Sequence, residues 1–423
     1  MKKIVITLIL PLFLEAHSIP ELFSALKSHS QIKSDEMLIK KSELQAQMVE
    51  SSLYPKVNLF ASYDNYNEPT GLLPVAPNDL VPMVQDQKIA QPFSNNIYRA
   101  GAQFSMPLFV KSIYTTAKKA KAMQRSAKAK KYINILKNEA LIVGTNANFL
   151  YLVSLKKALD TKEKSLLETQ RTLQIKVDNG RSPASALYKI NDSLNEVAIA
   201  KNSIDLQKKK LISTIESLTG VRLEQPVDME QIGSFTKGEL ASLKPLQEKI
   251  VADRANIKAQ KEKLYPSLYA HGSYTFSNAK AYNNDKSVNE RYGNIGLMLN
   301  IPLLEMNQYD SITLANITLK SSEVELEKLR DELISQAEML ESSLSLLDNS
   351  LKLYKHSLEN KQKLLNIAKV NFKSGRLSTE EYLRYEDAVV AQEANLYKTE
   401  ATKWQSEMQL AVIYANNIEE MVK

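Results

Sequence analysis

The side chains that most often do chemistry are few in this sequence of 423 residues, and they are scattered. There are no cysteines, which excludes disulfides, thiolate metal sites and a cysteine nucleophile. The four histidines are His17, His29, His271 and His356, and none lies four residues from another, so no helix presents a histidine pair to a metal. No phosphate-binding loop, ordered Ser-His-Asp set or cluster of carboxylates is evident. We therefore expect no enzyme, no metal site and no cofactor.

Two turns of one type carry the most distinctive charged residues. Asn179-Gly180-Arg181 recurs 195 positions later as Ser374-Gly375-Arg376. In both turns the glycine can adopt the left-handed conformation that ends a helix. The arginine that follows can complement the negative end of the helix dipole. The chemistry of these residues is therefore that of a charged helix end rather than that of catalysis.

The residues after each turn are expected to start a second helix. Ser182 and Ser378 are the expected N-caps, Pro183 would occupy the first helical position, and Glu381 follows Ser378 at the spacing of a capping box. Each turn therefore predicts a tight antiparallel helical hairpin.

The two turns belong to an internal duplication. Leu53-Tyr54-Pro55 recurs as Leu264-Tyr265-Pro266, and 73 residues separate Pro107 from Gly180 just as 73 separate Pro302 from Gly375. A repeat of this length must be recognised before a fold is assigned. The chain divides into 1–18 (signal peptide), 19–218 (first repeat), 219–243 (equatorial linker) and 244–423 (second repeat).

The first 18 residues have the pattern of a secretory signal peptide. A charged start, Met1-Lys2-Lys3, precedes an apolar run at 4–14 that is too short to span a bilayer as a helix. The alternative is a buried N-terminal helix. We expect an exported protein, which makes nucleic acid an unsuitable partner.

Two segments in each repeat alternate between apolar and polar residues, as strands do. They are 57–64 and 98–107 in the first repeat and 268–277 and 294–301 in the second. Each has about 10 residues, the length of a tilted transmembrane strand. The polar faces hold little that could form a second core layer, which favours transmembrane strands over the alternative of soluble hairpins.

Loops of unequal length are expected to join the strands. Residues 65–97 are rich in proline, and residues 279–290 form a shorter polar connection. Longer loops of membrane barrels usually face outward.

The remainder is expected to be helical. Residues 112–178 contain a single glycine and no proline, and 306–372 contain neither, so each predicts a helix of roughly 100 Å. A helix this long needs a coiled-coil or helical-barrel assembly. Shorter helices are expected at 183–218 and 379–418 after the turns, and at 20–52 and 244–263 before the strands.

The order strand, strand, long helix, Gly-Arg turn and returning helix resembles the outer-membrane efflux protein family of TolC-like channels. The supporting motifs are Leu-Tyr-Pro before each strand pair, Pro-Leu after it, and the turn from Phe372 to Leu383. The resemblance implies a mainly α fold with transmembrane β structure. A duplicated repeat would give four strands per chain to a trimeric 12-stranded outer-membrane β-barrel, continued by a long periplasmic α-helical barrel.

Physical reasoning from the strand count leads to a similar assembly. Four strands cannot close a barrel, and open strand edges cannot lie in lipid. Two copies would give eight strands, whose interior side chains fill, whereas three copies would give 12 strands and a lumen. The family resemblance implies the homotrimer.

The resemblance also implies a function and partners. The chain would be a passive exit duct in the cell outer membrane, with a large periplasmic portion, joined through a periplasmic adaptor (membrane fusion protein) to an inner-membrane pump. One alternative is a periplasmic coiled-coil tether without a through-pore. Another is the same duct dedicated to heavy-metal or protein export, and the sequence leaves the cargo open.

Specific residues are assigned by the same resemblance. Gly180, Arg181, Ser182, Gly375, Arg376 and Ser378 would be adaptor-contact tips. Phe372, Glu381 and Arg384 would form the pore gate, in which Glu381 matches an acidic position of the family. Arg384 occupies a second position that is usually acidic, and the first apex has Ser185 where an acid would stand. For Glu381 the alternative role is a capping-box residue only.

A basic run is confined to the first repeat. Residues 111–137 hold nine lysines and arginines and no acid, whereas 306–330 in the second repeat are nearly balanced. The run would be either a solvated helix face or a contact with anionic lipid or cell-wall polymer.

Overall fold

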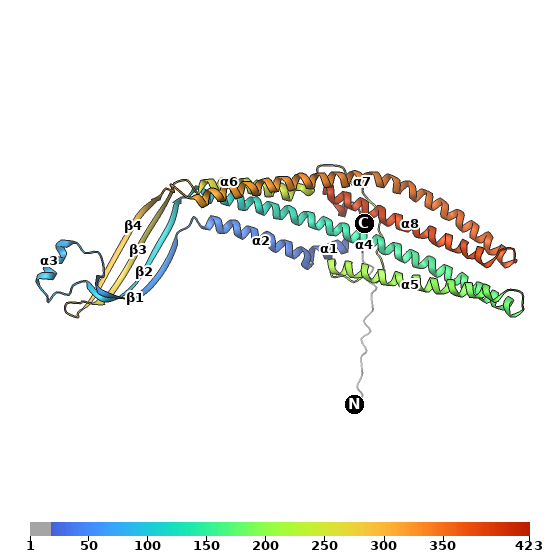
Figure 1. Ribbon diagram of the computed structural model, residues 1–423, viewed down its shortest axis with the longest axis horizontal. Coiled ribbons are helices and arrows are strands. Elements are labelled where there is room, and N and C mark those ends of the chain that lie inside the picture. Colours follow the sequence, from blue (N-terminus) through green and yellow to red (C-terminus); the bar gives the residue numbers. More distant parts are fainter. Residues whose placement is uncertain (1–17) are drawn as a thin grey trace, which may run out of the picture. The chain divides into compact units, whose positions relative to one another are not determined.

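The computed structural model describes residues 18–423, so the expected signal peptide lies, except for Ser18, outside the described residues. Figure 1 labels the elements. They are α1 (Ile19–Ser28), α2 (Ser30–Ser51), β1 (Lys56–Gly71), α3 (Pro77–Gln85), β2 (Phe93–Phe109), α4 (Lys111–Asp178), α5 (Ala184–Thr219), η1 (Ala241–Leu243), α6 (Lys244–Glu262), β3 (Ser267–Lys280), β4 (Ser287–Asn300), α7 (Met306–Lys373), α8 (Thr379–Tyr414) and η2 (Ile418–Glu420).

The described chain forms two compact units, each with segments of both sequence repeats. The sheet unit comprises Ile39–Ala127 and Leu246–Glu325. The helical unit comprises 18–38, Lys128–Pro245 and Leu326–Lys423.

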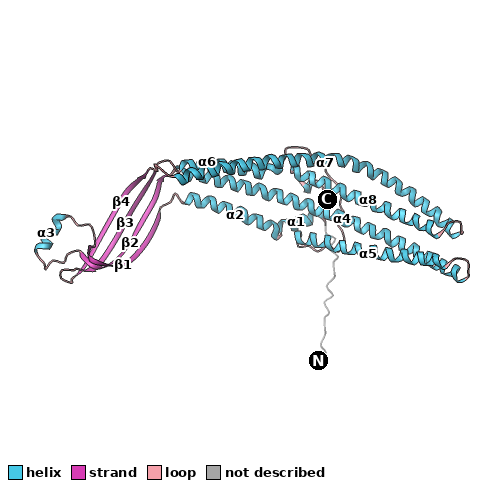
Figure 2. Ribbon diagram, viewed as in Figure 1, coloured by secondary structure: helices cyan, strands magenta, loops and turns pink. Residues whose placement is uncertain are grey.

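All four strands of the sheet unit join one antiparallel sheet of order β1-β2-β3-β4 (Figure 2). The β2–β3 pairing joins the two repeats. In the middle of the sheet one row crosses all four strands, namely Asn58, Gln103, Ser273 and Asn294. The outer edges of β1 and β4 have no strand partner within the described chain.

The two faces of this sheet differ as the alternation predicts. The face with Leu59 and Ile295 is apolar, and these side chains are 84% and 81% exposed. The opposite face, called here the polar face, carries the row of Asn58 and the row of Ser62, Arg99 and Ser277. At the hairpin end of the apolar face, the rings of Tyr63 and Tyr98 lie 4.8 Å apart. Exposed apolar side chains bordered by tyrosines are typical of a lipid-facing strand surface.

The strands are longer, and their loops shorter, than the alternation predicted. They span 14 to 17 residues instead of about 10. The expected loop at 65–97 is reduced to 72–92 and contains the helix α3, and the loop at 279–290 is reduced to 281–286. At the outer ends the polar face carries the apolar residues Ile97, Ala279 and Val288, which pack against Leu72 of the loop, so the alternation is lost there.

The long helices agree with the sequence and also agree with each other. Both α4 and α7 have 68 residues, and both returning helices, α5 and α8, have 36. Their equal lengths support the duplicated repeat. None of the helices within residues 18–423 combines the length and the apolar character needed to cross a bilayer.

Two of the predicted helices differ from the structure. The helix expected at 20–52 is broken at His29, whose backbone is extended. The break lets α1 bury Ile19, Leu22 and Phe23 completely in the main core of the helical unit. The helix expected to reach residue 418 ends at Tyr414, because Ala415 takes a left-handed conformation.

The basic run makes ion pairs within each unit. In the sheet unit Lys121 of α4 pairs with Glu50 of α2 at 2.7 Å, and Arg125 pairs with Glu248 of α6 at 2.8 Å. In the helical unit Lys131 lies 2.8 Å from Glu36. Part of this run therefore contacts neighbouring helices instead of forming a purely solvated face.

Candidate functional site

The two helical hairpins of the helical unit end side by side in two exposed turns, called here the first tip (178–183) and the second tip (373–378) (Figure 1). In the first tip Gly180 has a φ of 67°, and its amide donates to the Val177 carbonyl at 2.9 Å. The Arg181 amide donates to the Lys176 carbonyl at 2.7 Å. These two bonds form a Schellman motif, which satisfies the last carbonyls of α4.

The second tip repeats this geometry. Gly375 has a φ of 76°, its amide donates to the Phe372 carbonyl at 3.1 Å, and the Arg376 amide donates to the Asn371 carbonyl at 2.9 Å. No atom outside the turn lies within 4 Å of where a Cβ would stand on Gly180 or Gly375. Both glycines are therefore required by the backbone angle and not by lack of space.

The helix starts differ between the tips, and here one sequence prediction is wrong. Ser378 caps α8 as predicted: its hydroxyl accepts from the Glu381 amide at 3.2 Å, and Glu381 accepts from the Ser378 amide at 3.0 Å. Ser182 does not cap α5, because Pro183 itself is the N-cap residue and provides no side-chain bond. Pro183 therefore precedes the helix instead of occupying its first position.

A groove of about 460 Å³ separates the tips and brings together several of the predicted residues. Arg181, Ser182, Gly375, Ser378 and Phe372 line it, together with Lys189 and Glu380. Gly180, Arg376, Glu381 and Arg384 do not line this groove.

Two carboxylates just beyond the second tip are charged at neutral pH. Hydrogen bonding to Lys189, 3.1 Å away, lowers the pKa of Glu380, and Arg384 at 3.0 Å lowers it further. Hydrogen bonds from Ser378 lower the pKa of Glu381. The Arg384 guanidinium thus pairs with Glu380, four residues earlier on the same helix.

Phe372 belongs to a packed cluster instead of projecting into solvent. Its ring stacks on Tyr382 with centroids 4.7 Å apart, and both side chains are buried. Lys176 lies over the Phe372 ring at 6.0 Å. Within one chain Phe372 therefore helps to join the two hairpins.

A buried polar link, which sequence reasoning missed, lies beneath these rings. The hydroxyls of Ser165 on α4 and Tyr382 on α8 are 2.7 Å apart, and both also bond the carboxylate of Glu386. Burial and the Glu386 carboxylate raise the pKa of Tyr382 to about 12, so the phenol stays protonated. No local motif joins residues 165 and 382, which are 217 positions apart.

Comparisons with known proteins agree with this geometry. Residues 241–416 match the model of the outer membrane efflux protein family, whereas no curated protein sequence matches the chain. The family is one of channels and not of enzymes.

Solved structures similar to this chain include outer-membrane channels. The CmeC channel of Campylobacter jejuni has a TM-score of 0.77 at 16% identity, covering 94% of this chain and 85% of that one. VceC of Vibrio cholerae has a TM-score of 0.74 at 12% identity (94% and 96% covered). The open-state MtrE channel of Neisseria gonorrhoeae has 0.74 at 13% identity (94% and 88%).

The family match and the shared fold confirm the resemblance and the fold class predicted from the sequence. These similar structures show that the chain has the fold of outer-membrane channels.

The buried link predicts a local effect of Tyr382→Phe. Losing the phenol hydroxyl leaves the Glu386 carboxylate short of a donor, which costs about 1–3 kcal/mol for a buried group. We expect backbone amides near the start of α8 to exchange hydrogen roughly tenfold faster or more, measured by mass spectrometry. Tyr385→Phe is the matched control, since Tyr385 is half-buried on the same helix. Equal protection in both variants would contradict a stabilising role for the link.

Proposed function

We propose that this chain, whose residues 241–416 match the outer membrane efflux protein family, is the outer-membrane channel component of a tripartite export system. It would be a passive duct, supplied by an inner-membrane pump through a periplasmic adaptor. The observation that carries the proposal is a four-stranded sheet with an apolar exposed face and two unpaired edges, joined in sequence to helices of 68 residues.

The sheet edges support a homotrimer. Edge amides and carbonyls of β1 and β4 cannot remain unpaired in lipid. Pairing β4 of one chain with β1 of the next satisfies both edges, and three chains close a ring of 12 strands that leaves a lumen. The polar face would line the lumen, and the apolar face would contact outer-membrane lipid.

The exposed apexes support adaptor docking at the tips. Gly180, Arg181, Gly375 and Arg376 are all exposed, and the two turns share one backbone geometry. Two equivalent turns per chain would present six similar sites around a trimer. Ser182 and Ser378 would border these sites.

Residues just beyond the second tip would form the gate. Glu381 is exposed and charged, so a trimer would place three carboxylates around the tip opening, where they would favour cations. Arg384, engaged with Glu380, would modify this ring, and Phe372 would brace it through Tyr382.

The first experiment tests assembly and conduction. In mild detergent, light scattering should show a trimer, and the trimer should conduct ions across planar bilayers. A folded monomer that keeps its strand signal would exclude the duct. A trimer that never conducts would favour the tethering alternative.

A second experiment tests docking. In the variant Arg181→Glu with Arg376→Glu, charge reversal at both apexes should reduce export by cells while trimers still form. Arg171→Glu with Arg330→Glu is the matched control, because both arginines are exposed on α4 and α7, the helices that lead to the apexes, and neither lies in a turn. Normal export by the apex variant would show that docking does not depend on these arginines.

A third experiment separates the gate role of Glu381 from its capping role. Glutamine also completes a capping box, so Glu381→Gln removes the charge and keeps the helix start. Cation selectivity in planar bilayers should fall. Glu380→Gln is the control, since that carboxylate is already paired with Lys189 and Arg384. Unchanged selectivity in Glu381→Gln would leave this residue as a helix cap only.

A further inference from the structure

We propose that residues 72–92, called here the mouth loop, fold across the lumen face of the sheet and form an apolar constriction at the extracellular mouth of the duct. The inference rests on the proposed function, because it takes the polar face of the sheet as the lumen face. It assigns to this segment a role that neither the helical tips nor the gate residues supply.

Burial shows on which face the mouth loop lies. In the outermost regular row of the polar face, Ile97, Ala279 and Val288 stand side by side on β2, β3 and β4. Leu72, the first residue of the mouth loop, packs with them in one buried cluster, and Ala90 near the other end of the loop packs against it. Leu72 is buried and Ile97 is fully buried. The loop therefore covers the polar face and not the apolar one.

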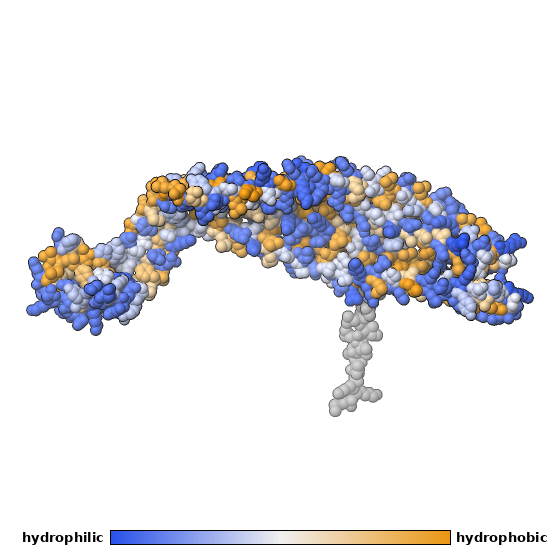
Figure 3. All heavy atoms as spheres, viewed as in Figure 1, coloured by the Kyte–Doolittle hydropathy of each residue, from blue (hydrophilic) through white to orange (hydrophobic). Residues whose placement is uncertain are grey.

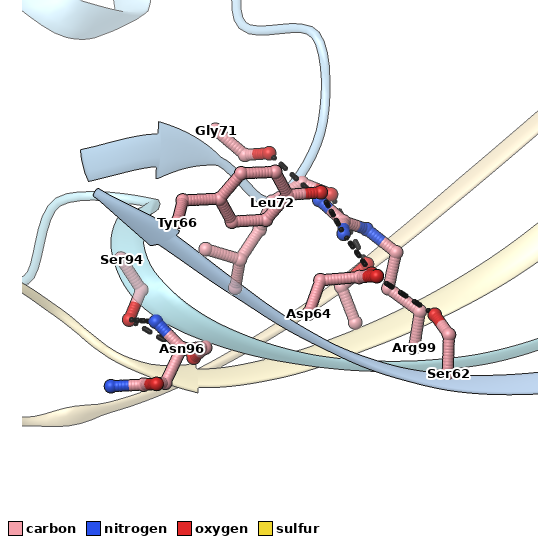
Figure 4. Close-up of polar contacts among 9 residues, drawn as sticks. Ser62, Asp64, Tyr66, Gly71, Leu72, Ser94, Asn96 and Arg99 are labelled. Carbon is pink, nitrogen blue, oxygen red and sulfur yellow. Dashed lines mark hydrogen bonds and ion pairs between the residues drawn. The ribbon is translucent and has the colours of Figure 1, made fainter. Parts of the chain in front are cut away.

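An arginine of the polar face holds the end of β1 against the sheet (Figure 4). Arg99 of β2 donates to Asp64 at 2.9 Å, to the Tyr66 hydroxyl at 3.1 Å and to the Gly71 carbonyl at 3.3 Å. The Gly71 bond fixes the backbone just before the mouth loop. Charge-assisted bonds of this kind are stronger than neutral ones, so the loop begins from a fixed point above the polar face.

Further bonds hold the loop across the sheet. The buried Ser277 hydroxyl of β3 donates to the Leu72 carbonyl at 3.1 Å, two strands away from β1. On the return path, the Asn283 amide group donates to the carbonyls of Gln87 and Ile89, and Lys286 donates to the Lys88 carbonyl at 2.9 Å. Both ends of the loop are therefore attached to the second repeat.

The middle of the loop is apolar and uncovered. None of the residues of α3 is buried, and Val81 and Val84 are 52% and 60% exposed. Figure 3 shows apolar side chains gathered on the surface around this helix. With three copies at one mouth, such side chains would make a narrow, poorly hydrated opening, which resists polar solutes.

The test uses the absence of cysteine from the chain. Gln103→Cys places one thiol on the polar face, on the periplasmic side of the Arg99 row, where Gln103 is exposed. A polar maleimide that cannot cross the outer membrane is added to intact cells. Replacing the mouth loop by Asn-Gly, which suits a two-residue hairpin, should speed labelling of this thiol about tenfold or more.

Two further variants provide the controls. Lys280→Cys, at the outer end of β3 on the opposite face, should label equally fast with and without the mouth loop. Arg99→Ala with Ser277→Ala removes the bonds that hold the start of the loop, without deleting the loop. This variant should also speed labelling at Gln103→Cys, and it tests the constriction if the deletion variant does not assemble.

The outcomes separate the two proposals. Rapid labelling of Gln103→Cys that neither loop variant changes would overturn the constriction and leave the duct intact. A thiol that stays unreactive in every assembled variant, while Lys280→Cys reacts, would show that the polar face is not an open lumen and would overturn both proposals.

Discussion

The unpaired backbone edges of β1 and β4 are the constraint on which the rest of this architecture depends. In lipid, a free strand edge leaves a row of amides and carbonyls without partners, and each costs several kcal/mol. A single chain with four strands cannot remove its edges by closing on itself. In lipid the fold would therefore become complete only between chains, and every other feature would have to be compatible with a ring.

Helix order in the sheet unit is compatible with that requirement. Lys121 joins α4 to α2, Arg125 joins α4 to α6, and Arg254 of α6 lies 3.0 Å from Glu323 of α7. The resulting order of neighbours, α2, α4, α6 and α7, follows the strand order β1 to β4. The helices and the strands of the sheet unit therefore have corresponding outermost elements, α2 with β1 and α7 with β4. The next copies would join at these two edges.

The duplication explains the scaffold but leaves the two tips chemically different. Equal helix lengths bring both turns to one end of the helical unit, and each turn uses the same glycine-dependent motif. Only the second tip has a capping box, however, and only it has the carboxylates Glu380 and Glu381. The two tips share their backbone geometry because that geometry positions the apexes, whereas the charged residues next to the tips are free to differ.

The sequence predicted those features whose signal is local. Glycine turns, the Ser378 capping box and the period of the strands each depend on residues a few positions apart. The prediction failed at Ser182, because a proline next in the chain took the capping position. It also failed at strand ends, where the loop that contains α3 covers the sheet and the alternation no longer reports a lipid boundary.

Contacts between the repeats could not be predicted in the same way. Ser165 meets Tyr382, and Ser277 meets Leu72, only after the two halves have packed, and neither pair leaves a pattern in the sequence. In each pair a buried hydroxyl, that of Tyr382 or that of Ser277, has its partner in the other repeat. A buried polar group must find a partner, so such bonds specify how the halves pair rather than adding much net stability. The duplication therefore supplies two similar halves, and a few unique buried bonds determine how these halves pack against each other.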